Sequence, residues 1–357
     1  IALTPLLMHY AKQLRMIDEP GGRKVHEVAI PRCGGIGLAV GTIVAIFLFV
    51  PLKPEIMGLI SGGAIILLFG LLDDRYELSY KWKFFGQFIA VIAVMLGGIS
   101  IFSLPFNGLD QGTIFITLPL TLFFSIGVIN AVNLSDGLDG LAAGIMLLSF
   151  CTIAFLAIEG DSQIVAVIAL AVAGGIVGFL WFNTHPAVVF MGDTGSQFIG
   201  YMATFLTLYL TQIGNQTLNP ALPLLILGLP ILDTLTVMIR RIRRGQSPFS
   251  PDKTHIHHRL LEKGFTHAEA VGAIYIAQGA FLASAIFFRY ASDLTVIGLY
   301  IGISSTILIL FYWAGQSEWL LHGDAVDGDR RGRSFWRNLK LFNYCRHYIN
   351  ISLAIFL

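Results

Sequence analysis

The stretch Asn130-Ala131-Val132-Asn133-Leu134-Ser135-Asp136-Gly137-Leu138-Asp139-Gly140-Leu141 places two amides and two carboxylates at the end of a long apolar run. In one continuous α-helix, each step of three residues falls about 60° short of a full turn, so the ends of this stretch would face opposite ways. Gly137 and Gly140 permit backbone angles that other residues resist. We therefore expect the helix to end near Asp136 and restart, so that the four polar side chains converge on one site.

The composition around this stretch is that of a membrane protein. Of the 357 residues, 55% are hydrophobic and 13% are charged, and the mean hydropathy is +0.74. Apolar runs of about twenty residues recur, long enough to cross a bilayer as helices. We expect an all-α, polytopic membrane bundle of about eleven transmembrane helices. The expected spans are 1–14, 34–51, 56–72, 84–104, 114–134, 138–158, 163–182, 197–213, 220–240, 270–290 and 294–314.

The basic residues indicate how these spans are oriented. Of the 23 lysine and arginine residues, only Lys53 and Arg289 fall on one side when the spans alternate. The opposite side, which is rich in basic residues, is expected to face the cytoplasm. The sequence therefore predicts a transmembrane bundle over 1–314 and a cytoplasmic tail over 315–357. The predicted cytoplasmic loops are 15–33, 73–83, 183–196 and 241–268.

The polar clusters of the chain lie on the same predicted side. A transporter needs polar groups at mid-depth and access from both sides, which this pattern does not show. A site at one membrane face instead suits an enzyme that joins a water-soluble substrate to a lipid. A transporter or lipid flippase with ion-coupled acidic groups is the alternative from another class. The formal net charge of +1 gives no reason to expect a nucleic-acid partner.

Acidic side chains recur at this predicted face. Asp73 and Asp74 end an apolar run, and adjacent carboxylates reach one aqueous mouth only at a helix end. Alone they could be a solvated boundary pair, but Asp136, Asp139 and Asp193 are predicted at the same depth. Asp193 opens a further helix whose small residues expose N–H groups to an anion, so it is either a cap or a metal ligand. Converging carboxylates favour a divalent cation.

A cationic loop follows the span 220–240. The run from Arg240 to Arg244 could simply bind anionic lipid headgroups. The histidines at 255, 257 and 258 could ligate zinc, but no cysteine accompanies them and the other candidate sites are rich in oxygen. Donation to phosphate oxygens therefore fits them better. We interpret Asp233, inside the preceding span, as a structural partner within the bundle.

Together these motifs resemble the polyprenyl-phosphate N-acetylhexosamine-1-phosphate transferases, membrane enzymes that move a sugar 1-phosphate from a UDP-sugar to a lipid phosphate. The resemblance covers nearly the whole chain. It is carried by Asp18-Glu19-Pro20, Pro31-Arg32-Cys33-Gly34-Gly35, Asp73-Asp74, Asn130 to Leu141, Phe190 to Ser196 and His255 to His258. The segment Ser247 to His258 is most similar to the WecA/TagO branch. The short spacing between Glu27 and Pro31 disfavours the branch that transfers phospho-MurNAc-pentapeptide.

The resemblance implies transfer of GlcNAc-1-phosphate from UDP-GlcNAc to undecaprenyl phosphate in a bacterial inner (cytoplasmic) membrane. UMP and undecaprenyl-diphospho-GlcNAc would be the products, at the start of O-antigen, common-antigen or teichoic acid synthesis. It also implies Mg²⁺ or Mn²⁺ at Asp193, with Asp73 as a further ligand. Another UDP-sugar, GalNAc or MurNAc-pentapeptide, is the alternative donor. The sequence leaves the oligomeric state open, a homo-oligomer included.

The expected mechanism follows from charge. A lipid phosphate is mostly dianionic at neutral pH and is already a nucleophile, but it must attack another anion. The metal ion would neutralise the diphosphate. We predict single displacement, with double displacement through a phosphorylated aspartate as the alternative. The predicted catalytic residues are Asp73, Asp74, Lys81, Asp139, His255, His257 and His258. The predicted substrate-binding residues are Asn130, Asn133, Asp136, Arg241 and Arg244.

Overall fold

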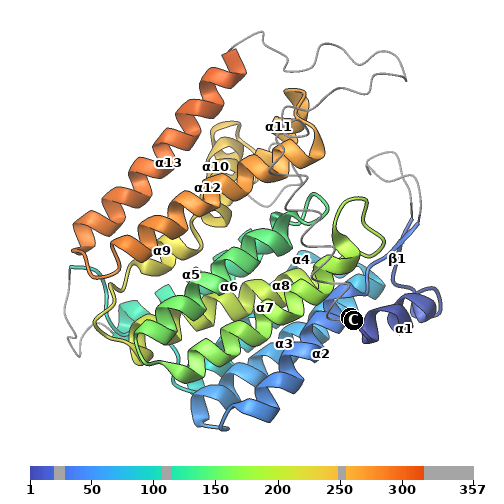
Figure 1. Ribbon diagram of the computed structural model, residues 1–357, viewed down its shortest axis with the longest axis horizontal. Helices are drawn as coiled ribbons and strands as arrows, with labels where there is room; N and C mark the ends of the chain where they lie inside the picture. The colour runs from blue at the N-terminus through green and yellow to red at the C-terminus, as the bar shows by residue number, and fades with distance from the viewer. Residues whose placement is uncertain (20–28, 107–113, 248–254, 317–357) are drawn as a thin grey trace, which may run out of the picture.

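The computed structural model describes residues 1–19, 29–106, 114–247 and 255–316. Within them the chain forms thirteen α-helices, one short π-helix and a two-stranded sheet (Figure 1). The helices are α1 (Leu3–Tyr10), α2 (Gly34–Phe49), α3 (Pro54–Tyr76), α4 (Tyr80–Leu96), α5 (Ile114–Leu134), α6 (Leu141–Glu159), α7 (Gln163–Asn183), α8 (Gly192–Tyr209), η2 (Leu210–Gly214), α9 (Leu222–Ile226), α10 (Gly228–Arg243), α11 (Ile256–Glu262), α12 (His267–Phe287) and α13 (Asp293–Gln316). Strand β1 (Ile17–Asp18) pairs antiparallel with β2 (Ile30–Pro31). The predicted tail beyond 316 and the loop segments 20–28 and 248–254 lie outside the described residues.

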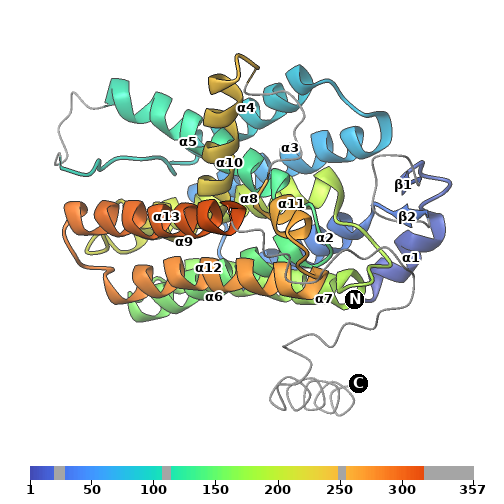
Figure 2. The same cartoon turned by 90° about the horizontal axis from the view of Figure 1, so that it is seen from above.

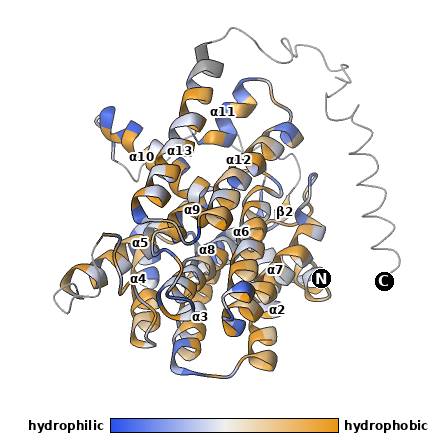
Figure 3. Ribbon diagram, turned by 60° about the vertical axis from the view of Figure 1, so that its left-hand side comes forward, coloured by the Kyte–Doolittle hydropathy of each residue, from blue (hydrophilic) through white to orange (hydrophobic). Residues whose placement is uncertain are grey.

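The helical, polytopic class predicted from the sequence is confirmed. Six described helices, α3, α5, α6, α7, α12 and α13, are long and apolar enough to cross a membrane. Hydrophobic residues dominate the helical ribbons (Figure 3). The other predicted spans are also helical, but their helices, α1, α2, α4, α8, α9 and α10, are all shorter than these six. Among the described residues, six helices rather than eleven therefore meet the length and hydropathy expected of a span.

Helix α8 forms the centre of the bundle. Every residue from Thr194 to Tyr209 is buried, and the helix packs against α2, α3 and α5. Glycines allow this close packing. A Cβ at Gly35 would lie 2.3 Å from the backbone nitrogen of Gly195, and one at Gly70 would lie 2.6 Å from the Cα of Thr194. These contacts hold the start of α8 against the starts and ends of its neighbours.

The predicted span 220–240 is helical but broken between α9 and α10. Pro230 has no N–H to donate, and its ring excludes the carbonyl four residues earlier. That carbonyl, of Ile226, instead accepts hydrogen bonds from Ser149 Oγ at 3.0 Å and Gln278 Nε2 at 2.9 Å. Beyond the break, α10 runs steeply across the direction of α12 and α13 (Figure 2).

The interruption predicted in the Asn130–Leu141 stretch is observed. Helix α5 ends at Leu134 and α6 begins at Leu141. The two glycines between them serve different purposes. Gly140 has a φ of +75°, in the region that favours glycine, whereas Gly137 makes room for a neighbour: a Cβ there would lie 2.1 Å from His257 Nε2. The packing of a distant histidine, as well as chain geometry, thus requires a glycine in this motif.

Candidate active site

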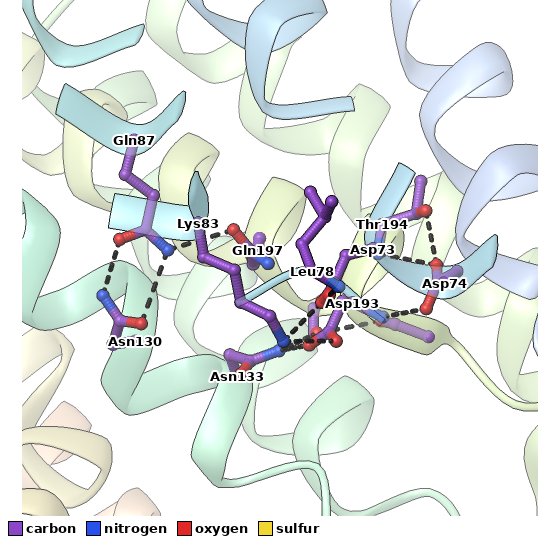
Figure 4. Close-up of polar contacts among 12 residues, drawn as sticks. Asp73, Asp74, Leu78, Lys83, Gln87, Asn130, Asn133, Asp193, Thr194 and Gln197 are labelled. Carbon is purple, nitrogen blue, oxygen red and sulfur yellow. Dashed lines mark hydrogen bonds and ion pairs between the residues drawn. The ribbon is translucent and has the colours of Figure 1, made fainter. Parts of the chain in front are cut away.

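Four polar side chains from four helices meet at one end of the bundle (Figure 4). Lys83 Nζ, on α4, forms an ion pair with Asp73 of α3 and lies 3.2 Å from Asp193 Oδ2 on α8. Asn133 Nδ2, on α5, donates to Asp193 Oδ1 at 2.5 Å. We call Asp73, Lys83, Asn133 and Asp193 the carboxylate centre. Asp73 is 3% exposed, so its charge is kept from bulk water and depends on these partners.

Asp74, and not Asp193, caps the start of α8, although the sequence alone allows Asp193 to be the cap. Its Oδ1 accepts the backbone N–H of Asp193 at 2.8 Å, and its Oδ2 accepts the backbone N–H of Thr194 at 3.0 Å. It therefore satisfies the free donors at the start of α8 from another helix. Gly192 is needed beside it, because a Cβ there would lie 2.6 Å from Asp74 Oδ2. Asp74 thus positions Asp193 within the site.

A second layer of amides lies one helical turn further along the helices. Gln87 follows Lys83 by four residues, and Gln197 follows Asp193 by four, so each pair shares a helix face. Gln87 Nε2 donates to Gln197 Oε1 at 3.0 Å, and Asn130 Nδ2 donates to Gln87 Oε1 at 2.7 Å. These amides satisfy one another and close the inner side of the carboxylate centre. Asn130, predicted to contact substrate, lies in this layer.

The histidine segment, His255 to His258, packs beside the Asn130–Leu141 stretch. Its position depends on Asp233, whose Oδ2 lies 2.8 Å from His255 Nδ1 and whose Oδ1 accepts the backbone N–H of Ile256 at 2.9 Å. Asp233 therefore ties the start of α11 to α10, as expected of a structural partner. His257 is buried and rests against Gly137. The loop predicted to be cationic thus contacts the acidic motif.

The environment shifts the pKa values of His257 and Asp136, which lie outside the long helices. Burial lowers the pKa of His257 to about 4, and the neighbouring His258 adds to this effect. His257 is therefore neutral at pH 7. Asp136 is exposed, yet the protein packed around its carboxyl group, together with the charges of Asp193, Asp74 and Asp139, raises its pKa to about 7. Negative charge thus accumulates in this region, and a divalent cation would relieve it.

Asp139 turns away from the carboxylate centre. Its Oδ2 lies 2.7 Å from His185 Nδ1 and accepts the backbone N–H of Ala187 at 3.1 Å. The expectation that all four polar side chains of the Asn130–Leu141 stretch converge therefore needs correction. Helix α5 continues past Asn133, so Asn130 lies one turn deeper, and the turn at Gly140 directs Asp139 toward the α7–α8 connection.

The basic residue at the carboxylates is Lys83, whereas Lys81, predicted from the sequence, is exposed at the start of α4. Arg241 is buried near the end of α10, and Arg244 is exposed beyond it. Sequence reasoning also missed Gln87 and Gln197. The signal that could have found them is the four-residue spacing of polar side chains on otherwise apolar helices.

An apolar groove of about 1020 Å³ lies between α12 and α13 and reaches α11. The basic side chains in its lining, Arg259 and Lys263, lie on α11 and at its end. The guanidinium of Arg259 lies over the ring of Phe311, 5.6 Å from its centroid. Because α11 also carries His257 and His258, the groove leads from the apolar helices to the histidine segment.

Comparison with known proteins identifies the family. The sequence model of glycosyl transferase family 4 matches residues 56–211. A probable undecaprenyl-phosphate N-acetylglucosaminyl 1-phosphate transferase from Bacillus subtilis is 37% identical over 295 residues, which cover 82% of each chain. The chain belongs to glycosyl transferase family 4. The residues matched to family 4 include the whole carboxylate centre, and the resemblance predicted from the motifs is confirmed.

Two further relatives agree with family 4 membership. A decaprenyl-phosphate N-acetylglucosaminephosphotransferase from Mycobacterium leprae is 36% identical over 324 residues, covering 80% of this chain and 81% of the relative. An undecaprenyl-phosphate alpha-N-acetylglucosaminyl 1-phosphate transferase from Escherichia coli (strain K12) is 32% identical over 281 residues, covering 77% and 76%. The similarity therefore extends well beyond the residues that the family model matches.

Proposed function

We propose that this protein transfers GlcNAc-1-phosphate from UDP-GlcNAc to undecaprenyl phosphate, releasing UMP. The names of the relatives from Bacillus subtilis and Escherichia coli support the transferred group and the acceptor. The observation that carries the proposal is the carboxylate centre, where Asp73, Asp193, Lys83 and Asn133 meet at the end of a membrane bundle. A diphosphate donor and a lipid acceptor need such a charged site at a membrane face.

The donor atoms of the carboxylate centre fit a hard divalent cation such as Mg²⁺ or Mn²⁺. Asp73 and Asp193 would hold it, because carboxylate oxygens are the ligands these ions prefer. When bound, the ion neutralises the charge of the diphosphate. Lys83 lies between the two carboxylates and supplies a fixed positive charge for the same oxygens. Asp74 keeps the backbone of Asp193 in place.

The reaction is a single displacement. An oxygen of the lipid phosphate forms a bond to the β-phosphorus, and the bond from that phosphorus to the UMP oxygen breaks. Asp73, paired with Lys83, orients the acceptor and is not the nucleophile. His257 and His258 act as hydrogen-bond donors to phosphate oxygens, with Arg241 and Arg244 as further anion contacts. Asp136 contacts the nucleotide or sugar. Asp139, in the turn before α6, supports the position of Asp136.

The site would face the cytoplasm of a bacterial cell, at an inner membrane that the helical bundle within residues 1–314 spans. The product would begin the assembly of a cell-surface glycan. This orientation rests on the distribution of basic residues, with Lys53 and Arg289 alone on the other side. Arg289 pairs there with Glu159 at 2.9 Å, which satisfies one of these two charges.

The groove between α12 and α13 suits the prenyl chain of the acceptor, since Arg259 and Lys263 can meet its phosphate. A Cβ added at Gly302, in the lining of the groove, would meet no other atom within 4 Å, and the same holds for Gly174 on α7, outside the groove. Gly302→Leu should raise the KM for the lipid several-fold and leave the KM for UDP-GlcNAc unchanged, whereas Gly174→Leu should change neither. If the KM for the lipid is the same in both variants, the prenyl chain does not bind in this groove.

The function is tested with purified protein in detergent, undecaprenyl phosphate and Mg²⁺, with UMP release as the readout. UDP-GlcNAc should give UMP and a lipid-linked product, while UDP-GalNAc and UDP-MurNAc-pentapeptide should give neither. If UMP is released only from another UDP-sugar, the assignment of GlcNAc as the transferred sugar is wrong. If no donor releases UMP with either Mg²⁺ or Mn²⁺, the protein is not this transferase. A sugar phosphate trapped on the protein without acceptor would establish double displacement instead.

A further inference from the structure

A second cluster of potential ligands lies outside the carboxylate centre. Asp139 precedes α6, His185 lies in the α7–α8 connection and His267 begins α12, so three distant segments contribute to it. One ligand atom from each lies within 4.8 Å of the others. We call Asp139, His185 and His267 the imidazole cluster. The phosphoryl transfer itself does not require an ion at this cluster.

The donor atoms of the two sites differ in kind. The carboxylate centre offers oxygen, whereas the imidazole cluster offers two ring nitrogens and one carboxylate oxygen. Zn²⁺ takes this nitrogen-rich set in protein sites that leave a fourth position open, and Mg²⁺ does not favour it. The His267 Nε2 atom is also buried and has no hydrogen-bond partner in the described part of the chain. An ion bound through this nitrogen would supply that partner.

We propose that Asp139, His185 and His267 bind a transition-metal ion of the Zn²⁺ class, at a site separate from that of the Mg²⁺ or Mn²⁺ ion. Tetrahedral zinc with bonds near 2.0 Å sets its ligand atoms about 3.4 Å apart. His185 Nδ1 and Asp139 Oδ2 now lie 2.7 Å apart, so an ion must part this pair and draw His267, whose ligand atom lies within 4.8 Å of the other two, into its shell. His185 can make this movement because 56% of its side chain is exposed. It now stacks on His267 with ring centroids 4.1 Å apart and would swing its nitrogen toward the ion.

The other two ligands are held by the fold. The backbone N–H of Ala187 donates to Asp139 at 3.1 Å. His267 follows Thr266, which caps α12 in a capping box: Glu269 Oε2 accepts the Thr266 backbone N–H at 2.9 Å. One adjustable ligand beside two fixed ones lets the site close on an ion at little cost. Binding would tie the start of α6, the α7–α8 connection and the start of α12 together.

The test uses the full chain without a histidine tag, in excess Mg²⁺ so that the carboxylate centre is supplied. Zinc binding is measured by equilibrium dialysis, and Co²⁺ substitution reports nitrogen ligation through its visible absorption. Wild type should bind one ion per chain. His185→Gln and His267→Gln should each weaken binding by about tenfold or more. His9→Gln, at an exposed histidine of α1, is the matched control and should bind as wild type does.

Three results would overturn the proposal. The first is that the wild type binds no zinc, and the second is that the folded His185→Gln variant binds zinc as tightly as the wild type does. The third is that only His258→Gln loses binding, which would assign the ion to the histidine segment. His185 is exposed, so its substitution should not affect folding, and thermal unfolding of each variant verifies this. UMP release in Mg²⁺ without zinc is measured in parallel, so failure of this site leaves the proposed transferase unaffected.

Discussion

The carboxylate centre and the histidine segment lie at the same end of the bundle but are held in different ways. In the centre, Asp73 and Asp193 come from separate core helices and face each other across Lys83. The histidine segment belongs to the short helix α11 and depends on one carboxylate, Asp233, at its start. The first gathers negative charge that a cation must balance, whereas the second presents imidazole N–H donors. Binding of the Mg²⁺ or Mn²⁺ ion should therefore depend on the carboxylate centre, whereas stabilisation of the transition state should depend on both regions.

The largest loss is expected for Asp193→Asn. This change removes a charged metal ligand but keeps the shape of the side chain, so turnover should fall by about a thousandfold or more. The backbone N–H of Asp193 still donates to Asp74, and the bundle should remain folded. UMP release and thermal unfolding of the same preparation measure the two effects. Turnover near the wild-type rate would remove Asp193 from the metal site.

Lys83→Ala and Lys81→Ala separate two lysines that lie two residues apart. Lys83 contacts both carboxylates, so its loss should lower turnover by about a hundredfold. Lys81 is exposed and should tolerate the change with little effect. The two variants, assayed side by side at saturating substrates, provide the measurement. The reverse order of effects would show that the catalytic lysine is Lys81, as the sequence alone indicates.

The lysine pair shows how far the sequence alone can go. Hydropathy and motif order are enough to predict a helical membrane bundle and to place Asp73 and Asp193 at one face. The contacts of Lys83 are not predictable, because a lysine at a helix start can point to solvent or into the bundle, and only tertiary packing decides. The role of Asp74 as a cap for α8 likewise requires the crossing of α3 and α8 at Gly70 and Thr194.

A smaller loss is expected for Asp233→Asn, which weakens the attachment of α11 without touching the carboxylate centre. Turnover should fall by about tenfold, since a donor that is misplaced contributes less to the transition state. The Mg²⁺ concentration that gives half-maximal rate should stay at the wild-type value, because Asp233 contacts His255 and Ile256 instead of the metal ligands. A Mg²⁺ titration of both proteins provides the measurement. A shifted Mg²⁺ requirement would mean that the carboxylate centre and the histidine segment are coupled.

The smallest effect concerns pH and stability. The pKa of His257 is about 4 in the folded protein, whereas an unfolded histidine has a pKa of about 6.5. At pH 7 both states are neutral, but between these two values the unfolded state binds the extra proton. Stability should therefore fall as the pH drops below about 6.5, and this loss should be smaller in His257→Gln.

Thermal unfolding in detergent at pH 7.5 and pH 5 measures this difference, with His9→Gln as the control at an exposed histidine. Wild type and the control should both lose more in melting temperature on acidification than His257→Gln does. A shift of about 2–4 °C is expected for each kcal/mol in a chain of 150–250 residues, and a smaller one in this longer chain. Equal losses in all three proteins would mean that His257 is protonated in the folded state, and the histidine segment would then carry positive charge toward the phosphates.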